Sequence, residues 1–517
     1  MSPSSFLRWV ENRYLSCADR SCGPNVDKIQ FMKKQTKQTT FTLSALFGVA
    51  MAGVTLANPV IVKPPNTIDV DTTWDSDPDN DGVIDTIYYM EEAIFVGDFA
   101  ENPTTRPTLT IAPGTIIAAT GSFTGTDGLD VGSLVIAQTG AINAEGTPEK
   151  PIIFTSADEA EFLHSVDVDG DGNVNATKPD PLGGEAGGAD GGAWGGVIIL
   201  GNAPINFYNS PDNNLGVFSV EGFAQNAGGS DIFYGGNDPA DNSGIFRYAS
   251  IRFGGFEFAQ DEEINGLTMA GVGAGTTIDH VEVVANTDDG FEWFGGTVNT
   301  NHLFALYCQD ESFDFDEGHQ GTHQFLFAVQ SNLSDNVIEA DGGNRTGSGV
   351  KNGEPLSLTK VFNATFVGAP GAADAFRMKD NFAGQFHNSI FTSIGDDLVR
   401  IDDAPTIGQV GTNLLVNNTL FGTFGDNETN NSLDAVDGDG NPDLGARASA
   451  QAEADVLAQT GNVLNATIDF SSVTRNDAGE VTEIDPRPAL GSSAWGTELT
   501  AGGFFPAKYR GAFGIEN

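Results

Sequence analysis

A short strand-like motif recurs along the chain and limits the fold more than any other feature. Copies begin at seven positions: SIRFGG at Ser250, HVEVVA at His280, HLFALY at His302, HQFLFA at His323, NATFVG at Asn363, NSIFTS at Asn388 and NTLFGT at Asn418. A second motif starts eight residues after three of these positions, at Asp288, Asp310 and Asp396. Repetition every ~20–30 residues, with two short strands per coil, is typical of a parallel β-helix. We therefore predict an all-β fold, a right-handed parallel β-helix (solenoid) with polar loop insertions.

The beginning of the chain has the composition of a secretory signal. Residues 32–57 contain a Met, a basic stretch, an apolar run and a small-residue cleavage site, the order found in signal peptides. Because signals stand at the start of a protein, residues 1–31 are predicted to be an untranslated upstream extension. The apolar run is shorter than the ~20 residues that a membrane span needs, so we predict no transmembrane span in the mature chain. We expect an exported protein, at the outer-membrane surface, in the periplasm or outside the cell.

The mature chain is predicted to contain three parts. Residues 58–100 form an N-terminal segment with an Asp-rich loop, residues 101–425 the parallel β-helix, and residues 426–517 a small C-terminal cap region. We predict a polar insertion at residues 157–192, and one helix, inside the cap, in the Ala-rich segment from Ala446. A cap is expected because the terminal coil of a stack would otherwise expose unpaired strand edges.

Acidic residues dominate the composition. The chain has 71 Asp and Glu residues against 24 Lys and Arg residues, which gives a net charge of −47. Such a surface repels nucleic acid and anionic lipid, and it attracts divalent cations. Cys308 is the only cysteine in the sequence after the predicted signal, so no intrachain disulfide is expected. The composition leaves the oligomeric state open.

The direction of the side chains follows from the period of two in each strand. Phe291 and Trp293 are predicted to lie in the core, and Glu292 between them then points outward. The same register applies to the later coils, whose strands stack about 4.8 Å apart. We therefore predict an outward column of charged side chains that consists of Glu292, Asp314, Glu339, Arg377 and Arg400.

Three Asp-rich loops have the spacing of short calcium-binding loops. Alternate oxygen-bearing side chains converge on a hard cation in such loops, and a Gly allows the sharp turn. The candidate ligands are Asp77, Asp79, Asp81 and Asp85 in the first loop, Asp167, Asp169, Asp171 and Asn175 in the second, and Asp437, Asp439 and Asp443 in the third. The loops lack the final bidentate Glu of an EF-hand and resemble the shorter calcium loops of dockerin and thrombospondin-type modules. We predict calcium as the cofactor; the alternative is three solvated acidic loops.

Histidines begin three of the repeated strands, at His280, His302 and His323, where later copies have Asn. A metal or catalytic role is one interpretation, especially for His319 and His323, which are four residues apart. That spacing brings two side chains together on a helix, whereas this stretch has the pattern of a corner followed by a strand. We favour a hydrogen-bonding ladder at a corner position that accepts Ser, His or Asn.

Four short motifs resemble those of polygalacturonases, which are also parallel β-helices. They are Asn286-Thr287-Asp288, Asp310-Glu311, Gly318-His319-Gln320 and Arg377-Met378-Lys379, in the order of that family. The resemblance implies a carbohydrate-active enzyme, a polysaccharide hydrolase or lyase, with Asp288, Asp310, Asp314 and Arg377 as its catalytic residues. The acid pair is Asp-Glu rather than two Asp, Gln replaces a Gly, and the His falls on the same coil as the acid pair. The alternative is a charged outer face that prevents strands from pairing with other chains.

Longer strings resemble uncharacterised secreted or outer-membrane proteins of Gram-negative bacteria, a family that includes a leptospiral surface lipoprotein. They are WGGVIILGNAPIN from Trp194, YGGNDPADNSG from Tyr234, EINGLTMAGVGAGTTIDHVEV from Glu263, TDDGFEWFGGTVN from Thr287, ESFDFDEGHQG from Glu311 and KYRGAFG from Lys508. The resemblance implies an exported parallel β-helix but no activity. Some members are lipidated, whereas no Cys follows the predicted cleavage site here.

Together these features predict an acidic, calcium-binding cell-surface or secreted β-helix protein with a structural, adhesion or glycan-binding role. The expected partner is a polysaccharide or a cell-surface component. The alternative is the carbohydrate-active enzyme on the same fold.

Overall fold

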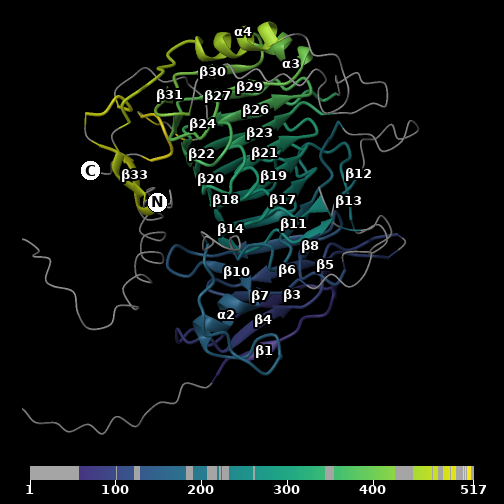
Figure 1. The fold of residues 1–517 in the computed structure, drawn as a ribbon. Helices are drawn as coiled ribbons and strands as arrows, with labels where there is room; N and C mark the ends of the chain where they lie inside the picture. The colour runs from purple at the N-terminus through teal and green to yellow at the C-terminus, as the bar shows by residue number, and fades with distance from the viewer. Residues whose placement is uncertain are drawn as a thin grey trace, which may run out of the picture.

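The computed structural model describes residues 58–513 except 101, 122–128, 182–189, 207–217, 221–222, 224–231, 260–261, 344–353, 426–445, 469, 476–480, 490, 496–504, 506 and 508. Within these residues the chain forms a parallel β-helix, as predicted, and Figure 1 shows its strands stacked from β1 towards α4. The predicted upstream extension and signal peptide, residues 1–57, lie outside the described residues.

One face of the β-helix is a 10-stranded parallel sheet. Its strands, in spatial order, are β2 (Thr67–Ile68), β5 (Ile94–Val96), β8 (Leu134–Ile136), β11 (Val197–Leu200), β17 (Leu267–Ala270), β19 (Phe291–Phe294), β21 (Phe313–Asp316), β23 (Ile338–Asp341), β26 (Phe376–Lys379) and β29 (Arg400–Ile401). Each coil contributes one strand to this sheet, so two strands that lie side by side in it belong to successive coils.

The other two faces belong to a 17-stranded sheet with two arms. The first arm contains β3 (Thr72–Trp74), β6 (Thr108–Ile111), β9 (Ala141–Glu145), β24 (Lys360–Phe362), β27 (Gln385–His387) and β30 (Leu415–Asn417). The second contains β1 (Val60–Val62), β4 (Thr86–Met90), β7 (Ile116–Ala119), β10 (Ile152–Ser156), β25 (Thr365–Val367), β28 (Ile390–Thr392) and β31 (Leu420–Phe421). In the middle of the stack the arms join in four long strands, β14 (Gly244–Arg252), β18 (Thr277–Val284), β20 (Thr300–Leu306) and β22 (Thr322–Val329).

A residue in the left-handed region bends each coil between the two arms. This column consists of Tyr248, His280, His302, Phe325, Asn363, Asn388 and Asn418, whose φ angles lie between 49° and 63°. Asn and His tolerate this conformation better than most residues, which accounts for their recurrence there. The repeat copies predicted at Ser250 and His323 are wrong by two residues in their alignment with the other copies, because Ser250 pairs with Glu282 and His323 pairs with Thr300.

The core is a stack of apolar side chains that point inward from all three faces. Phe291 stacks on Phe313 with ring centroids 5.5 Å apart, and Trp293 stacks on Phe315 at 4.6 Å. All four side chains are fully buried, as the period of two predicted. Each such side chain contributes about 1.5–3 kcal/mol of hydrophobic stabilisation.

The ends of the stack differ in part from the prediction. The first strand of the 17-stranded sheet begins at Val60 and that of the 10-stranded sheet at Thr67, so the stack already includes the segment 58–100 that the sequence set apart. Helix α4 (Ala446–Leu457) forms where predicted and contacts β29 and β30 at the last coils (Figure 1). Two further helices, α2 (Ala157–His164) and α3 (Ala404–Gln409), were not predicted. Helix α2 occupies the start of the expected polar insertion.

Three antiparallel hairpins and the end of the chain lie outside the coils. The hairpins are β12 (Phe218–Ser219) with β13 (Phe233–Tyr234), β15 (Glu257–Ala259) with β16 (Glu262–Glu263), and β32 (Phe470–Arg475) with β33 (Val481–Pro488). Near the C-terminus, Phe513 packs against Phe304 and Phe327 on the second arm. The buried guanidinium of Arg510 donates to the backbone oxygens of Asn418 and Ser493. This segment therefore covers the side of the stack.

Candidate functional site

The outward face of the 10-stranded sheet changes character halfway along the stack. On the earlier strands an apolar cluster covers it, with Ile198 and Ala270 packed under Tyr234 of the β12–β13 hairpin. From Glu292 on β19 onward the outward positions are charged, except for Phe294. The register pairs Glu292, Asp314, Glu339, Arg377 and Arg400 in succession, and this confirms the predicted column.

A second charged column lies two residues further along the same strands. Asp316 pairs with the outward Phe294, and Asp341 pairs with Lys379. Lys379 contacts the carboxylate of Glu339 as well as that of Asp341, the latter at 3.4 Å. The two columns therefore form one surface, acidic at β19–β23 and basic at β26–β29.

A third column lies at the corner where each coil enters this sheet. It consists of Asn265, Asp289, Glu311, Asn336, Asp374 and Asp397. Asp289 Oδ1 accepts a hydrogen bond from the backbone N–H of Glu311 (2.9 Å), and Asp374 Oδ1 accepts one from Asp397 (3.0 Å). Both side chains thus fix the next coil, a role that an amide oxygen also performs at Asn336.

Several carboxyl groups of these columns have pKa values that are shifted upward. Burial is the main cause that raises the pKa of Asp289, Glu311, Asp314 and Asp341 well above the usual range, and neighbouring carboxylates add to it. Oxygen atoms of Asp289, Glu292 and Asp314 lie within 4.8 Å of one another. Asp314 Oδ1 is buried and has no hydrogen-bond partner within the part of the chain that the structure describes. Strongly shifted carboxyl groups that cluster in this way are typical of functional sites.

The pKa of Glu339 is shifted in the opposite direction. Burial opposes its ionisation, but Lys379 and Arg377 outweigh burial and lower its pKa. Arg377 Nη1 lies 3.4 Å from Glu339, and its Nε donates to Asp402 (3.1 Å). Neighbouring positions of one column therefore have a raised carboxyl pKa at Asp314 and a lowered one at Glu339.

The residues of the alternative catalytic set are only partly brought together. Oxygens of Asp288 and Asp310 lie within 4.8 Å of each other, beside Asp289. Asp314 lies one strand from Glu339, and Arg377 one strand further. The catalytic set predicted from the sequence did not include the buried acids Asp289 and Glu311, although each directly follows an acid of the set in the sequence.

His319, the histidine of the polygalacturonase-like motif, lies in the core and not on this face. His319 and His323 are both fully buried, with Nε2 atoms 3.0 Å apart. The Nδ1–H of His319 donates to the oxygen of Gly295, and the hydroxyl of Thr300 donates to Nδ1 of His323. Burial lowers the pKa of both rings. A substrate on the outward face does not reach them, so this part of the resemblance does not hold.

The first Asp-rich loop is closed by its own backbone and by a lysine. Asp77 accepts hydrogen bonds from the N–H groups of Asp81 (2.9 Å) and Gly82 (3.1 Å), and Gly82 has φ 85°. Lys150 Nζ lies 3.0 Å from Asp77 and lowers the pKa of that carboxyl. Oxygens of Asp77, Asp79 and Asp81 still lie within 4.8 Å of one another. The pKa of Asp85 is raised by burial and by these three carboxylates.

The second loop repeats the geometry of the first. Asp167 accepts from the N–H of Gly172 (3.0 Å), and Asp171 accepts from that of Asn173 (2.7 Å). Its cluster is Glu161, Asp167 and Asp169. Sequence reasoning missed Glu161, because it belongs to the unpredicted helix α2. The predicted ligand Asn175 donates its backbone N–H to Glu161 (2.8 Å). The third loop, with Asp437, Asp439 and Asp443, lies outside the described residues.

No helix of the described residues is long and apolar enough to cross a membrane.

Comparison with known proteins identifies the family. Searches of curated proteins and of solved structures gave no match, and the narrower resemblance to the leptospiral lipoprotein family stays a prediction. Residues 160–468, more than half of the 517, match a family model described as a pectate-lyase like beta helix domain. The chain belongs to this family of pectate-lyase-like β-helix proteins.

Proposed function

We propose that this is an exported, calcium-stabilised β-helix protein that binds a polysaccharide along the charged face of β19–β29, at the cell surface or after release. The observation that carries the proposal is the column Glu292, Asp314 and Glu339, followed by Arg377 and Arg400, on one flat sheet face. Regularly spaced polar groups along a rigid stack suit a long, repetitive ligand. The family is compatible with either a structural or a polysaccharide-active protein.

The charge of the face favours certain ligands. Carboxyl groups outnumber the cationic side chains, and Arg377 and Lys379 already contact acids of the face. A polyuronate is therefore repelled unless a cation intervenes, whereas neutral and amino-sugar polymers are not.

Hydrolysis is the second candidate function, and one observation favours it. Asp314 and Glu339 are register neighbours whose pKa values are shifted in opposite directions. A carboxyl with a raised pKa beside one with a lowered pKa, on adjacent strands, matches the acid and the nucleophile of a glycosidase. Binding remains the first proposal, because Glu339 is buried and tied to two cations.

A binding panel tests the proposed face. We expect the full chain to bind at least one polymer in a set of neutral, amino-sugar and uronate polysaccharides, measured by affinity electrophoresis with and without calcium. Asp314→Asn is expected to weaken binding at least about tenfold, since it changes a group at the centre of the face. Glu145→Gln, an exposed carboxylate of the 17-stranded sheet, is the matched control.

The same samples decide between binding and cleavage. Release of reducing ends that Asp314→Asn or Glu339→Gln lowers by about 10²–10⁴-fold would establish a hydrolase. No binding across the panel, or equal binding by wild type and Asp314→Asn, would refute the proposed face.

Calcium is expected to raise the melting temperature, and excess chelator to lower it. A ligand that binds only the folded state stabilises it by about 2.7 kcal/mol at 100 times its dissociation constant. The second loop should contribute more, because Lys150 already neutralises part of the first. Asp169→Asn is therefore expected to reduce the calcium-dependent shift more than Asp79→Asn does, in melting curves of the full chain. A melting curve that chelator leaves unchanged would remove calcium from the proposal.

A further inference from the structure

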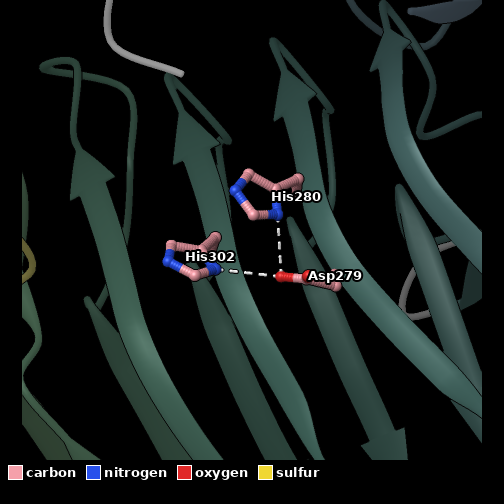
Figure 2. A group of neighbouring side chains, drawn as sticks. All are labelled: Asp279, His280 and His302. Atoms are coloured by element: carbon pink, nitrogen blue, oxygen red, sulfur yellow. Dashed lines mark hydrogen bonds and ion pairs between the residues drawn. The ribbon is translucent and has the colours of Figure 1, made fainter. Parts of the chain in front are cut away.

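A cluster of metal-ligating side chains lies on another face, at the bend between the two arms. It consists of Asp279 and His280 on β18 and His302 on β20 (Figure 2). The two imidazole rings stack with centroids 4.1 Å apart, and Tyr248 and Phe325 continue the stack on either side. The cluster therefore joins two neighbouring coils.

Both rings direct the same atom at one carboxylate. Nδ1 of His280 and Nδ1 of His302 each lie 2.9 Å from Oδ1 of Asp279. Figure 2 shows the second nitrogen of each ring on the side away from Asp279. The side chains of His280 and His302 are 9% and 11% exposed, while that of Asp279 is 28% exposed. The cluster is thus held by its surroundings and open to solvent at the carboxylate.

The bend itself does not require histidine. Asn363, Asn388 and Asn418 occupy the same column position with similar φ angles. The residue before the bend is acidic at Asp279, whereas Asn301 and Gln324 take this position in the next two coils. Two imidazoles and one carboxylate therefore lie together at a bend that other coils form with Asn.

We propose that Asp279, His280 and His302 bind a divalent transition-metal ion, with zinc the expected ion, through Oδ1 and the two Nδ1 atoms. Zinc bonds of about 2.0–2.1 Å place neighbouring tetrahedral ligands about 3.4 Å apart, so the 2.9 Å separations need only a small opening. Imidazole with one carboxylate suits zinc, copper or nickel, whereas calcium requires oxygen ligands. Water at the exposed side completes the coordination. Arg247, which pairs with Asp279 in the register, is itself neutralised by Glu145.

Zinc binding by the chelator-stripped full chain tests the proposal. The titration is carried out calorimetrically in excess calcium, so that the Asp-rich loops do not contribute. We expect wild type to bind one zinc equivalent that is lost in the His280→Asn/His302→Asn double variant, whose new residues already occur at this position of the column. His164→Asn, which removes an imidazole on α2, should retain that equivalent.

Two further measurements separate coordination from a structural role. Asp279→Asn keeps both histidines and is expected to weaken zinc at least about tenfold, which decides the matter if the double variant does not fold. The electron paramagnetic resonance spectrum of bound Cu²⁺ should show coupling to two imidazole nitrogens. Equal zinc binding by wild type and the double variant, or a copper spectrum without nitrogen coupling, would overturn the site.

Discussion

Arg252→Ala is expected to lower the free energy of unfolding by about 3–5 kcal/mol, the usual result of breaking a buried ion pair from one side. Arg252 Nη1 lies 3.2 Å from Glu159 on α2, and Nη2 lies 3.6 Å from Glu282 on β18. Its Nε donates to the hydroxyl of Ser250, which in turn donates to Glu282 (2.6 Å). The side chains of the three charged residues are at most 8% exposed. The substitution leaves two buried carboxylates without their cation.

A neighbouring arginine on the same strand provides the control for Arg252. Arg247 pairs with Glu145, but its side chain is 42% exposed, so Arg247→Ala should cost less than about 1 kcal/mol. Denaturant titrations followed by tryptophan fluorescence measure both variants. Equal losses for the two arginines would show that the buried network does not stabilise the attachment of α2.

The period of two was enough to predict the register of the charged face, because a one-residue slip would have placed Glu292 and Asp314 in the core. The aromatic residues on both sides of each acid allowed no other register. The bend was harder to place, because Tyr248 and Phe325 occupy its left-handed position in two coils and give no sequence signal there. Aligning histidines by identity therefore shifted His323 by two positions and placed a core residue in the corner.

Helix α2 was missed although its start is encoded locally. Ser156 and Glu159 have the spacing of a capping box, and the Ser156 hydroxyl accepts from the N–H of Glu159. The carboxylate of Glu159, however, pairs with Arg252, which is 93 residues away in the sequence. The burial of Asp289 and Glu311 was likewise beyond sequence reasoning, because long-range stacking of coils determines it.

The second large effect on stability is expected in the corner column, at Asp374. Asp374→Asn is expected to raise the free energy of unfolding by about 2–3 kcal/mol at pH 8, because burial raises the pKa of Asp374 to about 6 and each pKa unit is worth about 1.4 kcal/mol. The folded state binds the proton more tightly, so the ionised side chain destabilises the fold above pH 6 and has no such effect below about pH 4. The gain from Asn should therefore vanish at pH 4. Asn336 shows that an amide fits this column.

Asp289→Asn separates stability from function at the equivalent corner of the acidic cluster. Its pKa is raised by burial and then by Asp288, Glu311, Asp314 and Glu292, so the amide should also stabilise the fold at pH 8. The hydrogen bond to the N–H of Glu311 needs only an oxygen, which Asn retains. A chain keeps such a destabilising charge where function requires it. We therefore expect Asp289→Asn to gain stability and to lose polysaccharide binding, whereas Asp374→Asn gains stability alone. If both variants bind as wild type does, the acidic cluster is not the binding centre.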